Sequence, residues 1–203
     1  LSVSIGGKNN LEDSMRTIVF ILLTILISCK DGHHDHKHHA LPASTATEGS
    51  LFDLDDMWTT QDNKMFHWKD QKGEPMIVSM FYASCQSVCP RIVTDMQLIG
   101  KKIAQKTGKP PKVVLVSFDP EKDTAESLKA YSKKMELGDN WYLLNGKEDS
   151  VRTISVLLGI SYQKTSGNDF NHSTVISLVS KEGKILSRIE GVGADSSSIV
   201  DKY

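Results

Sequence analysis

Two cysteines and one distant histidine are the residues of this chain whose types and spacing could do chemistry. Cys85 and Cys89 stand four residues apart, and His172 lies far downstream. Two thiolates and an imidazole form a soft set of three donors, which suits monovalent copper better than magnesium or calcium. The same thiols could instead exchange disulfides, or close a short structural disulfide worth only about 2 kcal/mol. We favour a functional pair over a structural one.

The cysteines stand where a buried strand is expected to give way to a helix. Residues 76–83 are apolar and rich in strand formers, which predicts a buried central strand. Apolar residues with helical period follow at Val93, Met96, Ile99, Ile103 and Ala104. Pro90 suits the first turn of that helix. The pair would then lie near the positive end of the helix dipole, where the pKa of a thiol falls and thiolate is favoured.

His172 precedes a segment with strand character. Residues 173–179 alternate as a strand, and residues 181–184 form a hairpin turn into residues 185–189. A histidine at a strand entrance is, without further context, more often a surface residue or a hydrogen-bonding anchor than a ligand. The residues alone therefore leave its role open.

The remaining pattern alternates strands and helices. We expect an N-terminal strand pair at residues 57–60 and 64–68, strands at 112–118 and 141–144, and helices at 124–135 and 149–158. This αβ alternation, followed by a hairpin, predicts an α/β protein with a thioredoxin-like fold. Its central mixed sheet would be flanked by helices.

Three motifs in a fixed order resemble those of the Sco/SenC family. They are Cys-x-x-x-Cys-Pro after a strand at residues 85–90, Asp-Pro-x-x-Asp-Thr after the next strand at residues 119–124, and His-Ser before a later strand at residues 172–173. Each motif alone is weakly specific, whereas the three together are specific. The resemblance covers roughly residues 54–193.

The resemblance implies a function and a set of site residues. Members of this family look like thioredoxin-fold proteins, anchored outside the cytoplasm, that deliver copper to the binuclear copper centre of cytochrome c oxidase. By that resemblance Cys85, Cys89 and His172 would bind copper as Cu(I), with Cu(II) left open, and Asp119 would support the site from a second layer of residues. Asp-Pro after a strand is also an ordinary turn, and for Asp123 and Thr124 we favour the role of a helix N-cap.

The main interpretation is therefore a copper metallochaperone, a transfer protein rather than a turnover enzyme. The alternative is a thiol–disulfide oxidoreductase that keeps the acceptor's cysteines reduced, with Cys85 attacking and Cys89 resolving. General thiol oxidoreductases of this fold use a two-residue spacer and a proline opposite the cysteines. Here the spacer has three residues, and residues 172–174 contain no proline. A peroxidase of the same fold class would need an arginine and a threonine beside the cysteine, which the local sequence does not supply.

The N-terminal residues are typical of a secretion signal. A single cation, Arg16, precedes an apolar run that is shorter than the about 20 residues of a spanning helix. The run ends in a sequence that resembles a bacterial lipoprotein cleavage box, which predicts Cys29 as the lipidated residue. We interpret residues 1–28 as the signal peptide, and residues 1–14, before the first methionine, as an over-extended start.

Residues 29–50 form the expected tether. The tract contains five histidines, His33, His34, His36, His38 and His39. They could capture copper or zinc loosely, or simply belong to a solvated linker. Residues 51–203 form the expected domain, whose tail at 196–203 is typical of a last helix that stops early and so favours a truncated chain.

Charge and cysteine count bear on compartment and partners. The net charge of −1 gives no reason to invoke nucleic acid. Lipidation of Cys29 would leave an even number of cysteines, which is compatible with an oxidising compartment. We expect a monomeric, membrane-anchored lipoprotein outside the cytoplasm of a bacterium, whose partner is the copper-bearing subunit of cytochrome c oxidase or another copper acceptor.

Overall fold

The structure is a computed structural model that describes residues 49–167 and 169–203. The expected signal peptide at 1–28, the lipidated Cys29 and the histidines at 33–39 lie outside the described residues. Within the described ranges, no helix combines the length and the apolar character that crossing a membrane requires.

A seven-stranded mixed sheet forms the centre of the domain. Its strands are β1 (Trp58–Thr60), β2 (Met65–Phe66), β3 (Met76–Phe81), β4 (Lys112–Ser117), β5 (Trp141–Asn145), β8 (Val175–Val179) and β9 (Ile185–Glu190). They lie in the order β2-β1-β5-β4-β3-β8-β9. The pairs β3–β4 and β4–β5 are parallel, whereas β3–β8, β8–β9, β1–β5 and β1–β2 are antiparallel.

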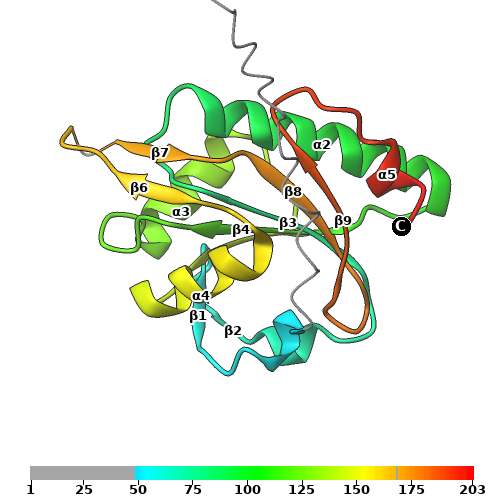
Figure 1. Cartoon of the computed structure of the whole chain (residues 1–203), viewed down its shortest axis with the longest axis horizontal. Coiled ribbons are helices and arrows are strands. Elements are labelled where there is room, and N and C mark those ends of the chain that lie inside the picture. Colours follow the sequence, from blue (N-terminus) through cyan, green and yellow to red (C-terminus); the bar gives the residue numbers. More distant parts are fainter. Residues whose placement is uncertain (1–48, 168) are drawn as a thin grey trace, which may run out of the picture. The chain divides into compact units, whose positions relative to one another are not determined.

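Helices cover both faces of this sheet. They are α2 (Val88–Thr107), α3 (Ala125–Lys134), α4 (Glu148–Leu158) and the short α5 (Ser197–Val200), with 3-10 helices η1 (Leu51–Asp53) and η2 (Trp68–Gln71) near the N-terminal strands. Figure 1 shows α2 and α4 on opposite sides of the sheet, with α5 beside α2. The parallel pairs β3–β4 and β4–β5 are joined through α2 and α3, and the chain then passes through α4 back to β8 on the other side of β3.

The predicted thioredoxin-like architecture and its N-terminal strand pair are confirmed. All six residues of β3 are buried, as expected for a central strand covered on both faces. On α2 the buried stripe is Cys89, Ile92, Val93, Met96, Ile99 and Ile103, while Ala104 is half-buried. The helix ends at Gly108, whose φ of 81° lies in the left-handed region and whose N–H donates to Ala104 O.

A second, two-stranded sheet was not predicted. β6 (Tyr162–Lys164) and β7 (Phe170–His172) form an antiparallel hairpin that pairs with no strand of the main sheet in the described part of the chain. His172 therefore ends β7 instead of opening the strand at 173–179, and β8 begins only at Val175. The sequence pattern missed this hairpin because its two strands have three residues each and none of these residues is buried.

The first described residues pack against the turn between β8 and β9. Ser50 Oγ donates to Glu182 O at 2.8 Å, and Leu51 N donates to Gly183 O at 2.9 Å. Met76, the first residue of β3, pairs with Val179, the last residue of β8. This turn therefore lies at the end of the sheet where β3 begins, opposite the end where β3 leads to the cysteines (Figure 1).

Candidate metal centre

The two cysteines lie at the predicted junction of strand and helix. β3 ends at Phe81, and Cys85 N donates to Tyr82 O at 3.2 Å, which closes the loop that leads to α2. Cys89 is the second residue of α2, and its N–H donates to Cys85 Sγ at 3.4 Å. Both thiols are free and buried, with Cys85 6% exposed and Cys89 fully covered. The helix start therefore holds both sulfurs in one small region.

The two thiols have different acidities because their surroundings differ. Burial acts to raise the pKa of Cys85, but hydrogen bonds from the backbone of Cys89 and Ser87 and from the side chains of Cys89 and Tyr82 together lower it. Burial raises the pKa of Cys89, and the neighbouring Cys85 raises it further. Cys85 is therefore the thiol that ionises first, as expected for a sulfur that accepts N–H groups at a helix start.

His172 reaches the cysteines from the β6–β7 hairpin. Its Nε2 lies 3.9 Å from Cys89 Sγ, and its Nδ1 lies 3.1 Å from Ser173 O. A carbonyl oxygen can only accept, so the contact with Ser173 places the proton on Nδ1. Nε2 is then left with a lone pair directed towards the sulfur, which is the form of histidine that binds a metal ion.

Aromatic rings surround the imidazole. The ring of Phe118 lies 5.0 Å from that of His172, and the ring of Tyr82 lies 6.2 Å away in an edge-on arrangement. Phe170 packs against both Phe118 and Tyr82 at 5.0 and 5.1 Å. These contacts hold the hairpin against the ends of β3 and β4.

The structure thus brings His172 to Cys89, and Cys89 to Cys85, from segments far apart in the sequence. Cys85, Cys89 and His172 are neighbours, but their side chains are not arranged as a complete metal-binding site. In residues 49–167 and 169–203, no group of three His, Cys, Asp or Glu side chains lies close enough together to hold a metal ion.

Asp119 is buried, 2% exposed. Its Oδ2 lies 3.8 Å from Lys122 Nζ, and its side chain lines a hollow of about 420 Å³ together with Phe118 and Tyr162. Among the described residues it makes no hydrogen bond to Cys85, Cys89 or His172. Phe118, its neighbour in sequence, is the residue that contacts the imidazole.

Asp123 is a supporting residue that the sequence reasoning missed. The cap we favoured for Asp123 and Thr124 belongs to Thr124, whose side chain accepts from Ser127 N at the start of α3. Asp123 instead turns inward, where its Oδ2 accepts from Ala83 N at 2.9 Å and from Ser117 Oγ at 2.5 Å. Burial raises its pKa against the effect of these two bonds. This carboxyl therefore ties the cysteine loop to the end of β4.

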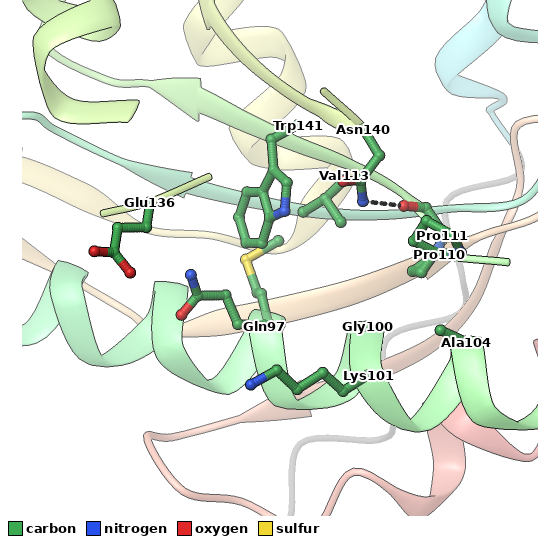
Figure 2. Close-up of a pocket in the computed structure, with 11 residues that line it drawn as sticks. Gln97, Gly100, Lys101, Ala104, Pro110, Pro111, Val113, Glu136, Asn140 and Trp141 are labelled. Carbon is green, nitrogen blue, oxygen red and sulfur yellow. Dashed lines mark hydrogen bonds between the residues drawn. The ribbon is translucent and has the colours of Figure 1, made fainter. Parts of the chain in front are cut away.

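A different hollow lies away from the cysteines. Figure 2 shows it between α2 and the first residues of β4 and β5, with Lys101 on one side and Trp141 on the other. Its volume is about 410 Å³, and Asn140 Nδ2 donates to Pro111 O at its rim. None of the described residues that line it is a cysteine or a histidine, and Met96 supplies its sulfur atom as a thioether (Figure 2).

The fold and the cysteine pair together define a thioredoxin-like protein with its cysteines at the end of a central strand. The family model described as SCO1/SenC matches residues 43–202, and the chain belongs to this family.

Known relatives agree with this assignment. The chain is 26% identical over 140 residues to the SCO1 protein homolog of Bacillus subtilis, covering 65% of this chain and 70% of that protein. It is 25% identical over 133 residues, 64% of each chain, to a Stutzerimonas stutzeri protein to which copper binding is ascribed. The solved structure of a SCO1/SenC family lipoprotein from Bacillus anthracis superposes with a TM-score of 0.66 and 27% identity, covering 75% of this chain and 93% of that one.

Proposed function

We propose that this protein is a copper-binding metallochaperone in which Cys85, Cys89 and His172 hold the transferred ion as Cu(I). The observation that carries the proposal is the 3.9 Å separation of His172 Nε2 and Cys89 Sγ. Bond lengths taken from zinc sites, about 2.3 Å to sulfur and 2.0 Å to nitrogen, put two donors of a trigonal ion about 3.7 Å apart. The separation of His172 Nε2 and Cys89 Sγ is thus close to the distance between two donors of one bound ion.

The donor chemistry supports copper as the cargo. Thiolates select Cu(I) over the hard cations, and imidazole completes a soft three-coordinate site. Copper binding is also ascribed to the relative from Stutzerimonas stutzeri. A three-coordinate ion leaves room for an incoming thiolate, so the copper can pass to an acceptor by exchange of ligands. By the family resemblance, that acceptor is the copper-bearing subunit of cytochrome c oxidase.

The N-terminal residues would set where this transfer occurs. We propose that lipidation of Cys29 anchors a monomeric protein to a bacterial membrane, outside the cytoplasm. The relative from Bacillus anthracis is described as a lipoprotein, which supports this part of the proposal. The tract from His33 to His39 would add weaker copper sites beside the anchor.

A thiol–disulfide oxidoreductase is the second candidate, and one observation favours it. The lowered pKa of Cys85 makes it the attacking thiol, and the buried Cys89 beneath it is placed to resolve a mixed disulfide. This chemistry has no need of His172. The two candidates therefore differ in what they require of that residue.

The test measures Cu(I) affinity of the reduced full-length protein by competition with a chromophoric Cu(I) chelator. His172→Ala and Cys85→Ser should each weaken the tightest site by at least about tenfold, because each removes one of three donors. The histidine tract stays intact in every variant, so a difference reports the proposed site alone.

Disulfide exchange with a small-molecule disulfide is measured on the same proteins. If His172→Ala binds Cu(I) as tightly as the parent while exchange still needs both cysteines, the oxidoreductase is the better description. Loss of copper affinity in both variants supports the metallochaperone.

A further inference from the structure

Tyr82 and Asp169 join the two segments that carry the candidate ligands. Tyr82 Oη donates a hydrogen bond to Asp169 Oδ1, 87 residues further along the chain. We propose that this bond is a latch that positions His172 towards the cysteines, so that Tyr82 and Asp169 are positioning residues for metal binding. The inference rests on the proposed function, since it specifies how the third ligand is held.

One half of the latch is built into the cysteine loop. Tyr82 follows β3 directly, its side chain is 4% exposed, and its carbonyl accepts from Cys85 N. The next residue, Ala83, is held by Asp123 through its backbone N–H. The phenol is therefore a fixed point on the part of the protein that carries the thiols.

The other half is built into the hairpin. Asp169 precedes β7 and stands three residues before His172. Its Oδ1 also accepts from Phe170 N at 2.9 Å, and its carbonyl accepts from Thr165 N at 2.8 Å, which closes the turn between β6 and β7. The residues between Asp169 and His172 are extended. A hydrogen bond that holds the Asp169 carboxylate in place therefore also sets the position of the His172 imidazole.

Apart from this bond, the hairpin is held to the rest of the domain by aromatic packing, a cation–π contact of Arg152 with Tyr162 and an exposed ion pair. β6 and β7 pair only with each other among the described strands. The ion pair between Lys164 and Glu121, at 3.3 Å, is exposed on both sides and contributes little. Packing of Phe170 on Phe118 holds the hairpin down, but a ring–ring contact adds only about 1 kcal/mol and permits more than one arrangement of the rings. The Tyr82–Asp169 bond is directional, so it can select one placement of His172.

The experiment measures Cu(I) affinity of the reduced full-length protein by chelator competition. Tyr82→Phe keeps the ring and removes the hydroxyl, and we expect it to weaken binding about five- to tenfold. Asp169→Ala should have a similar effect. Asp169→Asn retains a side-chain carbonyl that can accept from the phenol, so it should restore affinity to within about twofold of the parent.

Tyr162→Phe is the matched control. Tyr162 belongs to the same aromatic cluster and pairs with His172 across the hairpin, but its buried hydroxyl has no hydrogen-bond partner among the described residues. Removing that hydroxyl should leave copper affinity unchanged. An equal loss in Tyr162→Phe and Tyr82→Phe would mean that any altered ring disturbs the site, and the latch would be rejected.

A second step separates positioning from general damage. In a His172→Ala background, Asp169→Ala should cause no further loss, because Asp169 acts only through the placement of the imidazole. The same loss in both backgrounds would overturn the proposal. If Tyr82→Phe fails to fold, the Asp169→Ala and Asp169→Asn pair decides the question, since Asp169 is exposed.

The two proposals fail in different ways. If His172→Ala weakens binding while Tyr82→Phe and Asp169→Ala do not, the latch is wrong and the ligand role of His172 stands. If His172→Ala itself leaves affinity unchanged, the three-ligand site is wrong, and the latch falls with it.

Discussion

At the scale of single residues, two chemically identical thiols are made unequal by their partners. Cys85 Sγ accepts a hydrogen bond from the backbone N–H of Cys89, whereas the side chain of Cys89 is fully buried in the core. The pKa of Cys85 is lowered and that of Cys89 is raised. An incoming soft ion would therefore meet the thiolate of Cys85 first, and binding at Cys89 would require its proton to leave.

Asp123 leads to a prediction about stability. Asp123→Ala should lower the free energy of unfolding by about 2–4 kcal/mol, because it leaves Ala83 N and Ser117 Oγ buried without their acceptor. Asp123→Asn, whose amide oxygen can accept both bonds, should lose no more than about 1 kcal/mol. Urea denaturation of the three proteins checks this.

The raised pKa of Asp123 adds a dependence on pH. The folded state holds the carboxyl proton to higher pH than the unfolded state, so the folded state binds more protons between the two pKa values. Stability should therefore fall as pH rises from the ordinary pKa of the carboxyl through its raised value. The free energy of unfolding of the parent, relative to that of Asp123→Asn, should therefore decrease as pH rises through this range. If this difference does not change with pH, the prediction is wrong.

At the scale of elements, η1 and the β8–β9 turn are packed too closely to admit another carbon atom. Gly183 has a φ of +86°, and a Cβ there would overlap Ser50 Oγ and lie 2.7 Å from the ring of Phe52. We predict that Gly183→Ala lowers the free energy of unfolding by about 2–4 kcal/mol, from backbone strain plus overpacking.

Gly191 provides the control for that substitution. Its φ of +89° is nearly the same, but a Cβ at Gly191 would meet nothing within 4 Å. Gly191→Ala should therefore cost only the backbone strain, about 1 kcal/mol. Thermal and urea denaturation compare the two variants. If both variants lose the same free energy of unfolding, close packing of η1 against the turn does not contribute to the effect of Gly183→Ala.

The elements differ in how far the sequence could predict them. β3 and α2 are long and strongly periodic, so the strand, the helix and the junction that carries Cys85 and Cys89 followed from the pattern. β6 and β7 are three-residue strands without a buried residue, and Tyr162 and Phe170 pack on the ring of Phe118. No local pattern records such long-range contacts.

In the candidate site, too, the sequence pattern did not predict the contacts between residues far apart in the chain. His172 was selected through its motif, but its distance to Cys89 follows from the hairpin that the pattern missed. Asp123 was expected at a helix cap, and the structure turns it towards Ala83 instead. Tyr82 was expected only as part of an apolar strand. In each case the role depends on a partner 40 or more residues away.

At the scale of the whole molecule, the proposed anchor leads to a prediction about location. Cys29→Ser should move the protein from the membrane fraction to the aqueous fraction, because it removes the residue that would carry the lipid. The Cu(I) affinity of the tightest site should not change, since the proposed ligands all lie between residues 85 and 172. Fractionation of cells followed by chelator competition checks both parts. Retention of Cys29→Ser on the membrane would place the attachment elsewhere.

The contact of Ser50 with the β8–β9 turn fixes the point at which the chain enters the domain. That turn lies at the opposite end of the sheet from the cysteines, so the chain enters the domain at the end far from its thiols. The twenty residues between Cys29 and Ser50 can span at most about 70 Å. A compact domain of this size is about 40 Å across. If Cys29 is lipidated as proposed, this segment would be long enough for the domain to turn and bring its cysteine end towards a partner in the same membrane.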